Sequence, residues 1–195
     1  MKLSIDVFGR RFVFAMRKIE RVRGITNRVQ RADGSTAGYV FFADYDNIRE
    51  EVLMEEAEML AKELLGHVLV LRSSEKNYHA VCFNVYPSQH MIEQLLESTS
   101  ASRKHARMWL RVPERAHVLR LSSKDGGAKQ MPRVVRFFWD YNPDFGISRA
   151  HSLLYMRIAE KQGSIAARWL KALRARSELV GGEKVQVVEY ERPRY

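Results

Sequence analysis

The chain has 195 residues, 46% of them hydrophobic, which is enough for one sizeable core, and we expect a single domain over residues 1–195. Lysine and arginine exceed aspartate and glutamate by 10, which favours a polyanionic partner, above all nucleic acid. The single cysteine, Cys82, excludes an internal disulfide and a cysteine-rich zinc site, and no zinc site is expected. Neither a signal peptide nor an apolar run long enough to cross a bilayer is visible, so we expect a cytoplasmic protein without a membrane partner.

The first 37 residues are expected to form a basic N-terminal extension. Apolar residues alternate over residues 2–16, which predicts two short strands. The segment that follows is the most basic of this third of the chain. It is interpreted either as an arm that tracks phosphates or as the solvated face of a short helix. Its candidate nucleic-acid contacts are Arg17, Lys18, Arg21, Arg23 and Arg28.

A strand that ends in two acids follows a loop at residues 32–38. Five apolar or aromatic residues, at positions 39–43, lead into Asp44 and Asp46, as is typical of a buried strand with a polar end. Because side chains alternate along a strand, both carboxylates should lie on one face, roughly 7 Å apart. Such a pair can hold a divalent cation, and a strand end with solvated acids is the alternative.

The stretch from residue 38 to residue 121 alternates between predicted strands and helices. A helix is expected at 48–65, with Leu53, Ala57 and Leu60 inward, and a second helix at 87–96, with Ser88 as its N-cap. The predicted strands cover residues 38–46, 67–71, 77–83, 106–112 and 116–121. This order predicts an α+β fold with an RRM-like antiparallel sheet, helices on one face and the other face open.

Residues 125–195 are expected to form a C-terminal helical subdomain. A strand at 134–139 precedes one long helix from Ser148 to about Ser177, which Gly163 bends or breaks, and a strand at 184–190 closes the chain. The helix has a basic outer side, interpreted mainly as a solvated face. Its inward residues are predicted to be Leu153, Leu154, Ile158, Ile165, Trp169 and Leu173.

Two further stretches carry polar residues suited to a triphosphate. In residues 73–81, Asn77 and His79 share one strand face, after Ser73 and next to Lys76 in the preceding turn. A single histidine in a strand is most often structural. Hydroxyls, an imidazole and a lysine are nevertheless the donors that phosphates need. In the later basic strand, Arg120 and Ser122 share a face, and Arg120 and Lys124 are candidate phosphate contacts.

Taken in order, Asp44-x-Asp46, Ser73-x₅-His79 and Arg120-Leu-Ser-Ser resemble the motifs of the archaeo-eukaryotic primase superfamily over residues 38–124. The resemblance implies catalytic residues Asp44, Asp46 and His79, with Mg²⁺ or Mn²⁺ on the two acids. It also implies nucleotide contacts from Ser73, Lys76, His79, Arg120 and Ser122. The implied activity is that of a primase or primase-polymerase, as in archaeal plasmids and viruses. Its partners would be nucleoside triphosphates, DNA rather than RNA, and other replication proteins.

One departure from the family pattern leaves other functions open. The family has a third acid on a strand between the histidine motif and the basic strand, whereas residues 106–112 contain no acid and Glu114 follows a proline in an expected turn. Two-metal phosphoryl transfer needs carboxylates that fix both ions. A catalytically degenerate, DNA-binding replication initiator is therefore the first alternative. An NYN- or PIN-like metal-dependent nuclease is the second, because residues 41–48 also resemble its opening strand. A glycosyltransferase Asp-x-Asp motif has no further support.

Overall fold

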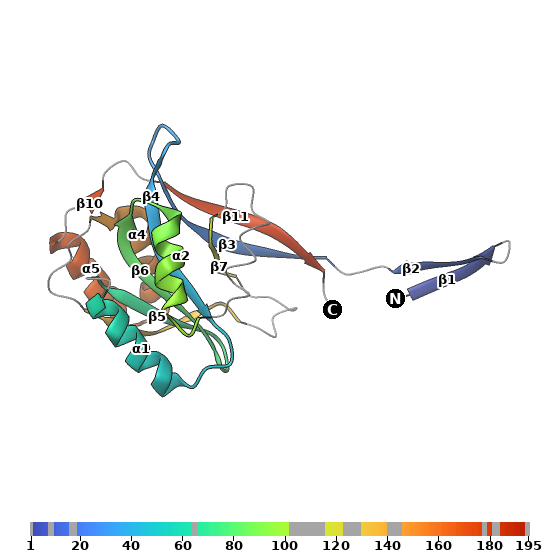
Figure 1. Cartoon of the computed structure of the whole chain (residues 1–195), viewed down its shortest axis with the longest axis horizontal. Helices are drawn as coiled ribbons and strands as arrows, with labels where there is room; N and C mark the ends of the chain where they lie inside the picture. The colour runs from blue at the N-terminus through green and yellow to red at the C-terminus, as the bar shows by residue number, and fades with distance from the viewer. Residues whose placement is uncertain are drawn as a thin grey trace.

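The structure is a computed structural model that describes the backbone at residues 2–7, 10–15, 19–63, 66–101, 116–122, 130–139, 146–176, 179–180 and 184–193. Side chains are described within residues 22–63, 66–101, 116–122, 130–139 and 146–175. The fold is α+β, as the sequence predicts (Figure 1). Within these residues, no helix has the length and apolar character needed to span a bilayer.

The elements that form the predicted core follow one another as expected. They are β4 (Thr36–Tyr45), α1 (Glu50–Glu63), β5 (Val68–Ser74), β6 (Asn77–Tyr86), α2 (Gln89–Glu97) and β7 (Val118–Arg120). Ser88 caps α2, since its hydroxyl accepts the Met91 backbone N–H at 3.3 Å. The strand expected at residues 106–112 lies outside the described residues.

The sheet is antiparallel through its main path. The strands lie in the order β8 (Arg133–Phe138), β5, β6, β4, β3 (Ile19–Gln30) and β11 (Lys184–Pro193). The short strand β7 pairs with β3 beside the end of β4. Around β4, this is the strand order of a split βαβ unit. Two short strands, β9 (Ile147–Ser148) and β10 (Leu179–Val180), extend the sheet beyond Asn84 and were not predicted.

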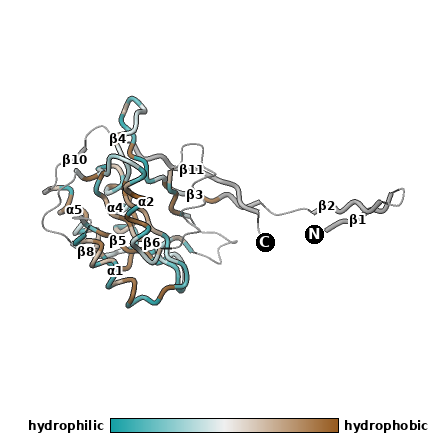
Figure 2. The backbone as a smooth tube through the Cα atoms, in the orientation of Figure 1, coloured by the Kyte–Doolittle hydropathy of each residue, from teal (hydrophilic) through white to brown (hydrophobic). Residues whose placement is uncertain are grey.

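Helices cover both faces of the sheet, which corrects the expectation of one open face. On one face, α1 and α2 bury Phe41, Ala43 and Tyr45 of β4 together with Leu53 and Ile92. The opposite face packs against α4 (Arg149–Lys161) and α5 (Ala166–Arg176). Its core includes Phe42, Val81, Tyr155, Leu170 and Leu173. Figure 2 shows hydrophobic residues concentrated where the helices meet the sheet.

The predicted long C-terminal helix is two helices. Ser148 caps α4 as expected, accepting the His151 backbone N–H, but the left-handed Gly163 (φ 64°) ends that helix and α5 begins at Ala166. The break resets the helical phase, so the predicted inward residues Ile165 and Trp169 are 68% and 47% exposed. Leu173 is buried as predicted.

In its described part, the basic N-terminal segment is a strand of the sheet and not a helix. From Ile19 it forms the long strand β3, in which Val22, Ile25 and Val29 are buried. The two predicted strands before it form a separate hairpin, β1 (Lys2–Val7) with β2 (Arg10–Ala15), apart from the body in Figure 1.

The buried side-chain amide of Asn27 connects three segments at the point on β3 where its pairing with β4 ends. The Asn27 side chain donates to the Val40 carbonyl and to Gln89 Oε1, both at 3.1 Å, and accepts the His117 backbone N–H at 2.9 Å. The Asn27 backbone N–H donates to the His117 carbonyl at 2.8 Å. Asn27 thus links β4, α2 and the segment that leads into β7.

Candidate functional site

The central pair of the candidate site is Asp44 and His79. The two residues are register partners on β4 and β6, so their side chains leave the sheet on the same face. His79 Nε2 lies 3.5 Å from Asp44 Oδ1, and the side chains are 6% and 27% exposed respectively. By alternation this is the face of Phe42 and Val81, opposite α1 and α2. The structure therefore brings together the first acid and the histidine, which are 35 residues apart in sequence.

Asp46 is not on the strand with Asp44. β4 ends at Tyr45, Asp46 is exposed, and Asn47 adopts the left-handed conformation (φ 54°) that turns the chain toward α1. Asp46 therefore lies in the turn after β4, one residue beyond the end of the strand that was predicted to include it. The turn is fixed, because the Asn47 N–H donates to Asn77 Oδ1 at 2.9 Å and the Ile48 N–H donates to the Lys76 carbonyl at 3.0 Å. These bonds join the acidic turn to the β5–β6 turn, in which the side chain of Lys76 is exposed.

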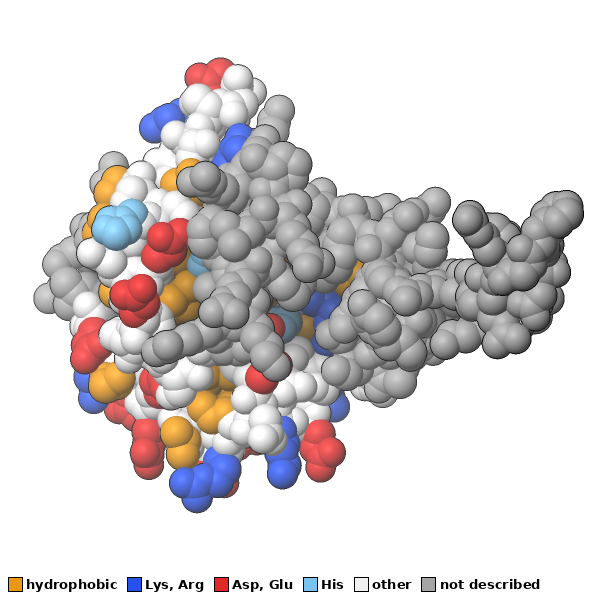
Figure 3. Space-filling model, turned by 45° about the vertical axis from the view of Figure 1, so that its right-hand side comes forward, with side chains coloured by type: hydrophobic (Ala, Val, Ile, Leu, Met, Phe, Trp, Pro, Cys, Tyr) orange, Lys and Arg blue, Asp and Glu red, His pale blue; other side chains and the backbone are white. Residues whose placement is uncertain are grey.

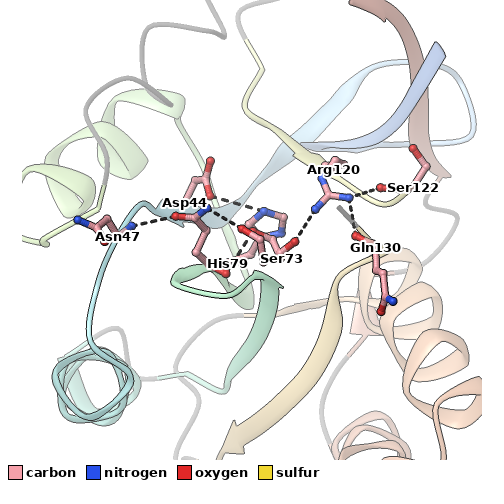
Figure 4. A network of polar contacts seen from close by, with 9 residues as sticks. Asp44, Asn47, Ser73, His79, Arg120, Ser122 and Gln130 are labelled. Carbon is pink, nitrogen blue, oxygen red and sulfur yellow. Dashed lines mark hydrogen bonds and ion pairs between the residues drawn. The ribbon is translucent and has the colours of Figure 1, made fainter. Parts of the chain in front are cut away.

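The side chain of Arg120 donates hydrogen bonds to backbone carbonyl groups and is not held ready to bind a phosphate. Its guanidinium group is 7% exposed and donates to the carbonyls of Ser73 and Gln130, both at 2.8 Å, and of Ser122. Figure 4 shows the guanidinium group of Arg120 between Ser73 on one side and Ser122 and Gln130 on the other. In this arrangement Arg120 is a positioning residue for Ser73, whose hydroxyl donates to the Asn77 carbonyl at 3.2 Å. The Ser122 hydroxyl accepts the Arg23 backbone N–H at 3.0 Å, which also makes it a structural group.

Burial shifts the pKa of two side chains on or beside β4. Burial lowers the pKa of His117, beside the divergence of β3 and β4, to about 4, although a backbone hydrogen bond with Phe42 opposes the shift. Burial and then Glu56 raise the pKa of Tyr45, whose hydroxyl donates to Glu56 Oε1 at 2.7 Å on the α1 side of the sheet. In β4, the Tyr45 side chain thus lies on the α1 face of the sheet, and the Asp44 carboxylate lies on the α4 and α5 face.

A divalent metal would find a partial set of ligands here. Over the described part of the chain, no group of three or more histidine, cysteine, aspartate or glutamate side chains is close enough to hold an ion. Mg²⁺ is commonly held by one or two carboxylates together with substrate phosphates and water. Asp44, with Asp46 on the adjoining turn, fits that mode and does not form a closed metal site.

Comparison of the chain with protein-family models, curated proteins and solved structures finds no significant match. The interpretation of the site therefore depends on the geometry and on the motif resemblance alone.

The remaining predicted nucleic-acid contacts are dispersed. Arg23 is exposed and Arg28 half-buried on β3, on which the backbone of Arg21 also lies. Arg17, Lys18 and Lys124 lie outside the described residues.

Asn77 lies inside the histidine motif, but no role was predicted for it from sequence. The Asn77 amide accepts from Asn47 and donates to Ser74 Oγ at 2.6 Å, so it ties the two turns that frame the site. Its position two residues before His79, after a turn, was the available signal, because Asn side chains often bond to backbone at turns.

Proposed function

We propose that this chain is a nucleotidyltransferase domain of the primase or primase-polymerase type, which adds nucleotides to a nucleic-acid strand in the presence of a divalent metal. The observation that carries the proposal is the contact between His79 Nε2 and Asp44 Oδ1, 3.5 Å apart on the sheet face opposite α1 and α2. The motif resemblance requires this convergence of the acid and the histidine, and the register between β4 and β6 is compatible with it.

The chain's own residues have separable roles in this proposal. Asp44 and Asp46 would hold Mg²⁺ or Mn²⁺ jointly with the phosphates of a nucleoside triphosphate, and the metal supplies charge neutralisation for the transferred phosphoryl group. His79 orients the Asp44 carboxylate and can donate to a phosphate oxygen. Lys76 is exposed on the adjoining turn, where its flexible side chain can reach a phosphate, and Asn77 keeps that turn next to the acids.

The test is incorporation of labelled nucleotides on a primed single-stranded template with Mn²⁺ or Mg²⁺. Asp44→Asn should lower incorporation by at least about a hundredfold, since one metal-binding carboxylate is removed and the fold is preserved. Asp33→Asn is the matched control, because Asp33 is an exposed loop acid that bonds only to Ser35 among the contacts described. Incorporation that is equal in wild type and Asp44→Asn would refute the proposal.

A second candidate function is DNA binding without catalysis, as in a replication initiator that retains only the fold. It is favoured by the lack of a third acidic ligand in the described part of the site. A protein of this kind should bind DNA equally well with and without chelator, and Asp44→Asn should leave both its affinity and its lack of incorporation unchanged.

A further inference from the structure

The two helical layers carry opposite charge. Helix α1 has six glutamates and one lysine, and α2 has two glutamates and no cation. Helix α4 has three cations and one glutamate, and α5 has four cations and no acid. Figure 3 shows acidic side chains spread over the side that carries α1 and α2. A polyanion is therefore repelled by one layer and attracted by the other, and the attracting layer lies on the Asp44 and His79 face.

An aromatic ring stands among these cations. Trp169 of α5 is 47% exposed, and Ile165, one turn earlier, is 68% exposed. Arg168 and Lys171, which flank Trp169 in sequence, are also exposed. An exposed indole on a helix whose other exposed side chains include cations offers both the ring on which a base of a single strand can stack and the charges that attract its phosphates.

The Trp169 ring is supported from beneath by other aromatic rings. Its centroid lies 5.8 Å from that of Trp139, at the end of β8. Trp139 in turn lies edge-on to buried His67 at 4.5 Å, and His67 stacks on Phe137 at 5.9 Å. A ring fixed in this way loses little freedom on binding, which favours stacking on a ligand.

The surface continues from Trp139 into a shallow hollow. The hollow has a volume of about 240 Å³, and its lining includes Trp139, the two cations Lys62 and Arg136, and Glu58 as the one acid. Lys62 is paired with Glu58 at 3.2 Å, so Arg136 of β8 is the cation by which this hollow adds to the basic surface of α5.

We infer that Trp169, with the flanking cations of α5, forms a stacking platform for single-stranded nucleic acid. The inference rests on the proposed function, in that it assumes a nucleic-acid substrate, and it specifies that substrate as a single strand. A second copy of the chain docked through the same face is a poorer occupant, because the two basic α4 and α5 layers would repel each other. A membrane is also poorer, because the apolar side of α5 (Ala166, Leu170 and Leu173) is buried in the core and cannot insert.

The test is the affinity of the full chain for a labelled 20-nucleotide oligothymidylate, measured by fluorescence anisotropy in chelator. Trp169→Leu, which keeps an apolar side chain, should weaken binding about tenfold, since stacking of one base is worth roughly 1–3 kcal/mol. Trp169→Phe, which keeps an aromatic face, should stay within about threefold of wild type. Ile165→Ala is the control for an exposed apolar residue directly before the same helix and should bind as wild type does.

Three results would overturn the inference: unchanged affinity in Trp169→Leu, an equal loss in Trp169→Phe, or an equal loss for duplex DNA, whose bases are not free to stack. An effect of Trp169→Leu on binding to phosphatidylserine vesicles, without one on the oligonucleotide, would also overturn it. Failure of the proposed function gives a different result, since incorporation would be absent while Trp169→Leu still weakened binding. An oligoadenylate RNA measured in parallel distinguishes RNA from DNA.

Discussion

Arg120 shows how a residue with a suitable charge can have a structural role. Arginine in a basic strand is a reasonable phosphate ligand from sequence, but its five donors equally suit backbone carbonyls. The decisive facts, the positions of the Ser73 and Gln130 carbonyls, come from segments 47 residues earlier and 10 residues later. No local pattern could have indicated them. Asp44 and His79 were predictable because each lies in a strongly patterned strand.

Arg120→Met should destabilise the domain by roughly 3 kcal/mol, because buried carbonyls lose their donors while the apolar stem is kept. The free energy of unfolding in urea measures the change. Arg133→Met, at an exposed site on β8, is the matched control and should change the free energy by less than about 0.5 kcal/mol. Equal stability of the two variants would contradict the role assigned to Arg120.

Gly38 is required by close packing of two strands. A Cβ at this position would lie 2.5 Å from the Tyr86 carbonyl oxygen and 2.6 Å from Val85 Cγ1. Gly38→Ala should therefore lower the free energy of unfolding by about 2–4 kcal/mol, since β4 and β6 must separate. Gly34→Asn is the comparison: nothing lies within 4 Å of a Cβ there, and Asn tolerates its φ of +86°. A melting temperature unchanged in Gly38→Ala would show that the strands adjust freely.

Among the elements, α1, α2 and the strands around them were predictable because each has one clear period and an identifiable end. The sequence analysis missed the phase of α5. Residues 154, 158, 165 and 169 fit a single helix, and only the left-handed Gly163 turns the last two outward. It also missed β3, whose buried valines are spaced irregularly between arginines. In both cases, tertiary packing decided between local patterns of similar strength.

Helix α4 is joined to the sheet by a buried histidine. His151 Nε2 lies 2.9 Å from the Thr26 carbonyl of β3, and Nδ1 lies 2.8 Å from the Ser148 hydroxyl. The carbonyl requires a proton on Nε2, so the Ser148 hydroxyl donates to Nδ1 and the ring is neutral. Burial lowers the pKa of His151 from 6.5 to about 4, although the Thr26 hydrogen bond opposes the shift.

This geometry predicts that the domain loses stability in mild acid. Between pH 6.5 and about pH 4 the unfolded chain binds a proton that the folded chain excludes, so the free energy of unfolding falls as the pH falls. The loss attributable to His151 is on the order of 3 kcal/mol and is complete below about pH 4. His151→Gln should flatten this part of a urea-unfolding profile measured from pH 7.5 to pH 4. The His117 contribution should remain. A profile as steep as that of wild type would refute the assignment.

At the scale of the whole molecule, the distribution of charge was the least predictable feature. The net charge of +10 is visible in the sequence, and it favours a polyanion without indicating a surface. Which helices share a face depends on strand order, and the sequence analysis placed helices on one face only. Once α4 and α5 cover the face of Asp44 and His79, the basic surface and the candidate site lie on the same side.

The separation of charge can be tested with two variants of equal net charge. Removing two exposed cations of α4, in Arg157→Gln with Lys161→Gln, lowers the net charge by two, as does adding two acids to the opposite layer in Met59→Glu with Gln94→Glu. If single-stranded DNA tracks α4 and α5, the slope of log affinity against log salt should fall by about 1.4 in the first variant, roughly 0.7 for each phosphate that the protein no longer neutralises. The second variant should keep the wild-type slope, because its new charges lie on the layer that DNA avoids. Equal slopes in the two variants would mean that DNA responds to total charge, and that neither helical layer forms its binding surface.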